Sequence, residues 1–79
     1  MENNILFLTQ KQKETLDFIK NFIARNGSAP LITELSENLK LKSLRSVTQR
    51  LESLEAKGFI RRDRFKHRGI TLTEDINPL

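Results

Sequence analysis

Residues 43–58 constrain the fold more than any other part of the chain. Ser43 can cap the N-terminus of a helix through its hydroxyl, and Gly58 can adopt the left-handed conformation that ends one. The apolar residues between them recur at steps of three and four: Leu44, Val47, Leu51 and Leu54. This spacing predicts a helix over residues 43–57 whose apolar stripe faces a core.

Away from this stripe, the same predicted helix carries side chains that suit base recognition. Arginine can bind guanine through two acceptors, glutamine can do the same for adenine, and serine or threonine can hydrogen-bond to several bases. A helix that is apolar behind and bears such groups near its N-terminus suits the DNA major groove. The alternative is an ordinary amphipathic surface helix. The predicted base-reading residues are Ser43, Arg45, Ser46, Thr48 and Gln49.

The distribution of charge favours DNA as the partner. The net charge is +4, but residues 40–72 hold ten basic and three acidic residues, whereas residues 1–39 hold four and five. A polyanionic partner is the simplest explanation for this asymmetry, and a solvated charged surface is the alternative. Basic side chains on loops mostly position a protein on phosphates rather than specify bases. The predicted phosphate contacts are Lys42, Lys57, Arg61, Arg62 and Arg68.

The flanking segments predict a small domain that is mostly α-helical with one β-hairpin. A capping box at Thr9 and Gln12 begins a helix that ends near Asn26-Gly27. A shorter helix over residues 32–39 and the helix over 43–57 form a helix-turn-helix. Residues 59–62 and 69–72 then predict the two strands of a wing. The expected fold is a winged helix-turn-helix, with a three-helix core and a C-terminal wing over about residues 59–72.

This prediction places the domain at residues 9–72, between a lead-in at 1–8 and a tail or linker start at 73–79. The chain has no cysteine and one histidine, His67, so no disulfide framework and no cysteine- or histidine-rich metal site is expected. No apolar run approaches the roughly 20 residues of a membrane span, and the N-terminus lacks the features of a signal peptide. No base can be assigned beside a nucleophile. We therefore expect a cytoplasmic protein that is not an enzyme and uses no cofactor, metal or small-molecule substrate.

Several short motifs in combination make the chain similar to a known family. They include Leu8-Thr9 with Gln12, Asn26-Gly27-Ser28-Ala29-Pro30, Lys57-Gly58-Phe59-Ile60 and Arg68-Gly69-Ile70. From Leu8 to Leu72 the chain resembles the N-terminal winged helix-turn-helix domain of the LexA repressor family. The resemblance implies a sequence-specific repressor of bacterial or phage type, associated with the nucleoid, that binds double-stranded operator DNA. Such repressors typically control DNA-damage (SOS-type) genes.

The resemblance also implies where DNA would lie. Helix 43–57 would occupy the major groove, and the wing would meet the backbone or minor groove through Arg64, Phe65 and Lys66. The chain departs from the family pattern at Leu31, where a capping threonine is usual, and at the wing tip, which is usually small. The family also tends to have Asn and acidic residues on the reading helix, where this chain has Arg45, Thr48 and Gln49. The fold is therefore expected to transfer, but the operator sequence is not.

Members of this family continue into a C-terminal domain that dimerises and cleaves itself with a Ser/Lys pair when RecA filaments stimulate it. A chain of 79 residues has no room for that domain. A homodimer is therefore expected only with such a domain or on DNA. Two alternative functions are a winged-helix module that binds proteins and a LexA-like regulator unrelated to DNA damage. The five basic residues within 61–68 favour DNA over a protein partner.

Overall fold

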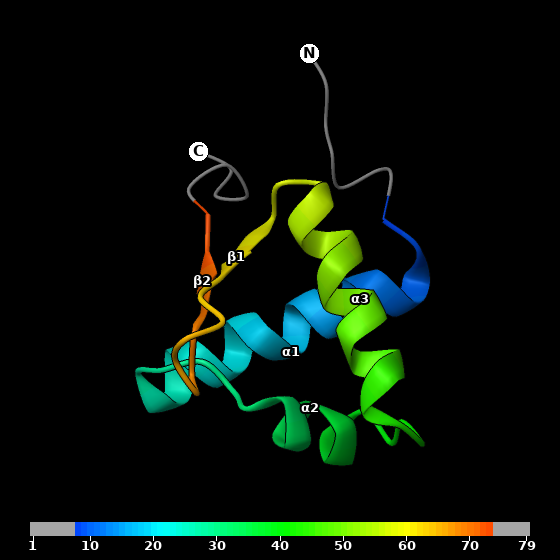
Figure 1. Ribbon diagram of the computed structural model, residues 1–79, viewed down its shortest axis with the longest axis horizontal. Coiled ribbons are helices and arrows are strands. Elements are labelled where there is room, and N and C mark those ends of the chain that lie inside the picture. Colours follow the sequence, from blue (N-terminus) through cyan, green and yellow to red (C-terminus); the bar gives the residue numbers. More distant parts are fainter. Residues whose placement is uncertain (1–7, 74–79) are drawn as a thin grey trace.

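The computed structural model describes residues 8–73, so all but one residue of the predicted lead-in (1–8) and of the predicted tail (73–79) lies outside the described part. Three helices, α1 (Gln10–Asn26), α2 (Ile32–Asn38) and α3 (Leu44–Ala56), precede two antiparallel strands, β1 (Ile60–Arg62) and β2 (Ile70–Leu72). In Figure 1, α3 crosses α1, α2 lies below both, and the hairpin stands at the side away from the N-terminal end of α1. This arrangement confirms the predicted winged helix-turn-helix. None of the helices described is long and apolar enough to cross a membrane.

The start of each helix follows from its local sequence. The predicted capping box is present at α1, where Thr9 Oγ1 accepts from the Gln12 amide and Gln12 Oε1 accepts from the Thr9 amide, each at 3.1 Å. At α2, Leu31 occupies the N-cap position and has no side-chain oxygen to offer. Glu34 Oε1 instead accepts from the Leu31 amide at 2.7 Å, which satisfies one of the amide groups at this helix end.

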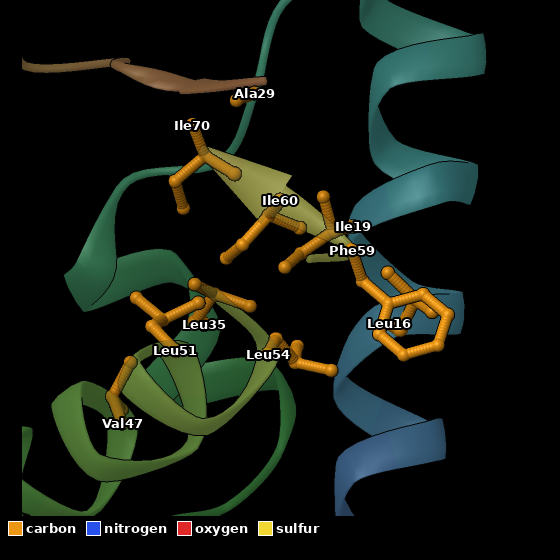
Figure 2. Close-up of a cluster of buried hydrophobic side chains, with 10 residues drawn as sticks. All are labelled: Leu16, Ile19, Ala29, Leu35, Val47, Leu51, Leu54, Phe59, Ile60 and Ile70. Carbon is orange, nitrogen blue, oxygen red and sulfur yellow. The ribbon is translucent and has the colours of Figure 1, made fainter. Parts of the chain in front are cut away.

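One apolar core joins all five elements (Figure 2). Its buried members are Leu16, Ile19, Ala29, Leu35, Val47, Leu51, Leu54, Phe59, Ile60 and Ile70. Leu44 is an exception to the predicted stripe, because its side chain is 50% exposed. It is the first residue of α3, and the core packs against the helix from Val47 onward. The core therefore holds the body of α3 while leaving its N-terminal turn accessible.

The hairpin is held against the helices at its base. Ile60 pairs with Leu72, and Arg62 pairs with Ile70. Ile60 and Ile70 are buried, whereas Arg61, the residue after Ile60 on β1, is exposed. This is the alternation expected of a strand with one face on a core. Just beyond β2, Thr73 Oγ1 donates to the Gly58 carbonyl at 2.6 Å. The wing is thereby fixed to the C-terminal end of α3.

Candidate nucleic-acid interface

The outward side of α3 presents the two predicted base contacts with the longest side chains. Arg45 and Gln49 are exposed and lie four residues apart, which is about one helical turn. Neither side chain makes a hydrogen bond or an ion pair with any residue from 8 to 73. The opposite side of the helix is buried in the core at Val47, Leu51 and Leu54. We call Arg45 and Gln49 the reading face of α3, after the base contacts that the sequence predicts for them.

The other three predicted base contacts lie on different edges of α3. Ser43 Oγ accepts from the Ser46 amide at 3.2 Å and lies 3.2 Å from Ser46 Oγ, so both hydroxyls take part in the N-terminal cap. Thr48 is half-buried and lies seven residues before Glu55, on the edge of α3 that faces the wing. The five predicted residues therefore do not form a single surface.

The wing tip is a turn organised by Asp63. The Asp63 amide donates to the Gly69 carbonyl at 2.9 Å, and Asp63 accepts from the Lys66 amide at its carbonyl and from the Phe65 amide at Oδ1. A Cβ atom at Gly69 would lie 2.2 Å from the Asp63 carbonyl oxygen, so this closure requires glycine. The turn leaves Phe65 99% exposed between two basic side chains.

One wing cation is paired only weakly with α3. Arg64 Nη2 lies 3.9 Å from Glu55 Oε1, and both side chains are open to solvent. An exposed ion pair of this kind contributes little to stability. A phosphate near the wing could therefore replace Glu55 as the partner of Arg64.

The structure divides the predicted phosphate contacts into two groups. Lys42 and Arg61 are exposed and have no side-chain partner among residues 8–73. Lys57 Nζ instead donates to Gln12 Oε1 at 2.8 Å. Arg62 is half-buried, and its Nη1 is buried with no hydrogen-bond partner in the described part of the chain. Arg68 is held by the ion pair described next.

Arg68 joins the wing to the first two helices. Its Nη1 donates to Glu34 Oε1 at 2.8 Å and to the Ala29 carbonyl at 2.9 Å, and its Nη2 donates to Glu34 Oε2 at 3.2 Å. The guanidinium also lies over the Phe22 ring, 5.9 Å from the ring centre. Such a two-pronged pair fixes geometry as well as charge. The hydrogen bond from Arg68, together with that from the Leu31 amide, holds the pKa of Glu34 below its ordinary value.

This ion pair predicts a pH-dependent contribution to stability. A carboxylate whose pKa is lowered by folding stabilises the protein above its unfolded pKa, about 4.3 for glutamate, and loses that effect as the pH falls through the folded pKa. Glu34→Gln should therefore lower the free energy of unfolding at neutral pH, and its difference from wild type should shrink under acid conditions. Urea unfolding from about pH 7 down to about pH 3 would measure this. Glu37→Gln, at an exposed position of the same helix, is the control. A difference that stays constant with pH would contradict the assignment.

A basic groove beside α3 is absent from the sequence-based prediction. It lies between the first turn of α1, the turn that joins α2 to α3, and α3 itself, and we call it the α1–α3 groove. Its basic residues are Lys11, Lys40, Lys42 and Arg50. Of these, only Lys42 is a predicted contact. The other three come from separate segments and share no motif. The charge asymmetry of residues 40–72 hints at Lys40 and Arg50, but no signal in the sequence points to Lys11.

The three-helix core, the exposed side of α3 and the basic wing define the class of winged helix-turn-helix domains, which bind DNA through a helix in the major groove. Residues 6–69 match the family model described as "LexA DNA binding domain", and the chain belongs to this family.

Curated relatives agree with this assignment. The chain is 46% identical over 68 residues to a LexA repressor of Caldicellulosiruptor saccharolyticus, covering 86% of this chain and 34% of that protein. It is 42% identical over 65 residues to LexA repressor 1 of Geobacter sulfurreducens, covering 82% of this chain and 32% of the relative. The chain thus spans about one third of the length of these relatives.

Proposed function

We propose that this domain recognises a specific operator in duplex DNA and represses transcription there, with α3 in the major groove and the wing on the backbone or minor groove. The observation that carries the proposal is the reading face. Arg45 and Gln49 are exposed and have no partner within residues 8–73, on a helix whose other side is fully buried. Forked side chains held in this way can each bind a base edge through two hydrogen bonds.

The exposed cations around α3 support contacts with the DNA backbone. Lys42 lies just before the helix, and Arg61, Arg64 and Lys66 lie on the hairpin, all exposed. We assign phosphate contacts to these four residues. We assign Phe65 to packing against sugar or bases in the minor groove, where exposed apolar side chains can wedge between base steps. We assign Lys57 and Arg68 to support of the fold instead, because each donates to a side chain of another element.

The finer biology of the proposal follows from family membership. We infer that the target genes are DNA-damage (SOS-type) genes and that the protein acts at the nucleoid in a bacterial cytoplasm. The relatives extend well beyond this domain, so pairing of two copies on an operator would depend on a further region or on DNA itself. Self-cleavage by a Ser/Lys pair would likewise belong to that region. Base and phosphate recognition by these side chains needs no metal or cofactor.

Salt dependence tests whether charge drives the binding. Each neutralised phosphate contributes about −0.9 to the slope of log affinity against log salt. With four phosphate contacts, the slope should be about −3 to −4 between about 50 and 200 mM salt. The measurement is fluorescence anisotropy on a duplex that the purified domain has selected from random DNA. Affinity that is flat across this range would contradict the electrostatic account.

The same selection distinguishes the proposal from a protein-binding module. A sequence-specific repressor domain should enrich one motif from the random duplexes, because Arg45 and Gln49 discriminate between base pairs. A winged-helix module that binds proteins should enrich none. Enrichment of no motif would overturn the proposed function.

A further inference from the structure

The α1–α3 groove lies beside the reading face and on the other side of α3 from the wing. Ser46 and Gln49 help to line it, so it is continuous with the surface proposed to meet bases. The groove has a volume of about 480 Å³, and no acidic residue is among those that line it. The N-terminal turn of α1 and the turn between α2 and α3, which supply lining residues of the groove, lie at the side of the molecule opposite the hairpin (Figure 1).

Lys40, at the rim of this groove, has a backbone conformation that lysine disfavours. Its φ is +57°, in the left-handed region. The Lys40 amide donates to the Glu37 carbonyl at 3.3 Å and the Leu41 amide to the Ser36 carbonyl at 2.9 Å. These two hydrogen bonds form a Schellman motif, in which a residue in the left-handed conformation ends a right-handed helix. The corresponding residues after α1 and α3 are Gly27 and Gly58, with φ of +78° and +87°. Of these three left-handed helix ends, the one that lines the groove carries a lysine instead of a glycine.

The start of α1 also departs from the usual sequence preference, and it too brings positive charge to the groove. The first turn of α1 contains Lys11 and Lys13 and no acidic residue. Cations near the N-terminus of a helix interact unfavourably with its dipole. Lys11 lines the α1–α3 groove together with Lys40. Two unfavourable placements therefore bring positive charge to one groove, and local departures of this kind are expected at functional sites.

Arg50 completes the groove from the side of α3. Its Nη1 donates to Thr15 Oγ1 at 3.2 Å and to the Lys11 carbonyl at 3.4 Å, which anchors the guanidinium against α1. Within residues 8–73, Nε and Nη2 of Arg50 have no partner. An anchored guanidinium with donors to spare is suited to an anion with several acceptor oxygens, such as a phosphodiester.

We propose that the α1–α3 groove binds a backbone phosphate of the same duplex that α3 reads, through Lys11, Lys40 and Arg50. This inference rests on the proposed function and extends it. DNA phosphates flank the major groove on both sides, so a helix in that groove can be clamped from two edges. The wing supplies one clamp and the α1–α3 groove the other. Lys40 would thus trade stability of the helix end for affinity.

Paired substitutions separate the role of charge from the role of backbone conformation. Lys40→Gly removes the charge and relieves the left-handed lysine, so the melting temperature should rise by about 4 °C while affinity for the selected duplex falls about threefold to tenfold. The salt slope should become shallower by at most about 0.9, because the three cations share one phosphate. Lys40→Arg retains the charge and should leave affinity and slope close to wild type. Lys11→Gln should also weaken binding and flatten the slope, without lowering the melting temperature. Lys20→Gln, at an exposed position elsewhere on α1, should change neither the affinity nor the salt slope.

The outcomes distinguish this proposal from the proposed function. If the wild type binds its selected duplex with a steep salt slope, but Lys40→Gly and Lys11→Gln bind equally well, the groove has no phosphate contact and the proposed function stands. If Lys20→Gln weakens binding as much as Lys11→Gln does, the effect is one of net charge and the groove assignment is wrong. If the wild type selects no duplex, both proposals fall together.

Discussion

Leu51→Ala is expected to remove a large part of the stability of the domain. Leu51 is 0% exposed and lies beside Leu35 in the core (Figure 2). Truncating a buried leucine to alanine costs about 2–5 kcal/mol, through lost transfer free energy and the cavity left behind. A domain of this size has a total stability of only about 4–12 kcal/mol. Circular dichroism with urea titration would measure the loss.

Leu44→Ala is the matched control for this prediction. Leu44 lies on the same helix and belongs to the same sequence pattern, but its side chain is 50% exposed. The same truncation there should cost less than about 1 kcal/mol, because little apolar surface returns to water. Equal losses at the two positions would show that the N-terminal turn of α3 is as deeply packed as its middle, contrary to the structure.

Arg45→Ala and Gln49→Ala should each reduce affinity for the selected duplex by about 1–3 kcal/mol and relax preference at a few base positions. The reason is that each side chain is exposed on α3 without a partner in the described chain, so its donors and acceptors are available to bases. Binding of each folded variant to a panel of duplexes with single base-pair changes is the measurement. The melting temperatures should remain near that of wild type, because neither side chain supports the fold.

The double variant Arg64→Ala with Lys66→Ala should behave differently from the Arg45 and Gln49 variants. These wing residues are assigned to phosphates, so their loss should weaken binding to every duplex by a similar factor. It should also make the salt slope shallower by about 0.9 for each contact removed. Altered base preference in the wing variant, with preference intact in the Arg45 and Gln49 variants, would reverse the roles assigned to the two elements.

Much of the fold is predictable because its determinants are local. The capping box joins Thr9 and Gln12, which are three positions apart, and the core pattern of α3 repeats within one or two turns. The ends of α1 and α3 follow from Gly27 and Gly58, which adopt the left-handed conformation that glycine favours. Interactions over three or four residues are visible in a linear sequence, so the three helices, the hairpin and their order agree with the prediction.

The distribution of the basic side chains could not be predicted in the same way. Arg68 has the same charge and sequence setting as its neighbours on the wing, yet it pairs with Glu34, 34 residues earlier. Arg50 is anchored to the Lys11 carbonyl across 39 residues. Arg62 follows Ile60 on the inward side of β1 and is half-buried, whereas Arg61 between them is exposed. Only the packing of distant segments against one another separates cations that have protein partners from cations open to a ligand.

By itself, then, the sequence determined the secondary structure, the winged helix-turn-helix architecture and the exposure of Arg45 and Gln49, since capping, periodicity and alternation act over a few residues. The tertiary structure alone decided that Leu44 is exposed, that Lys57 and Arg68 have protein partners, and that Lys11, Lys40 and Arg50 line one groove. The physical reason is that a side chain's partners depend on which distant segments the core brings beside it. That arrangement exists only once the helices and the hairpin have packed together.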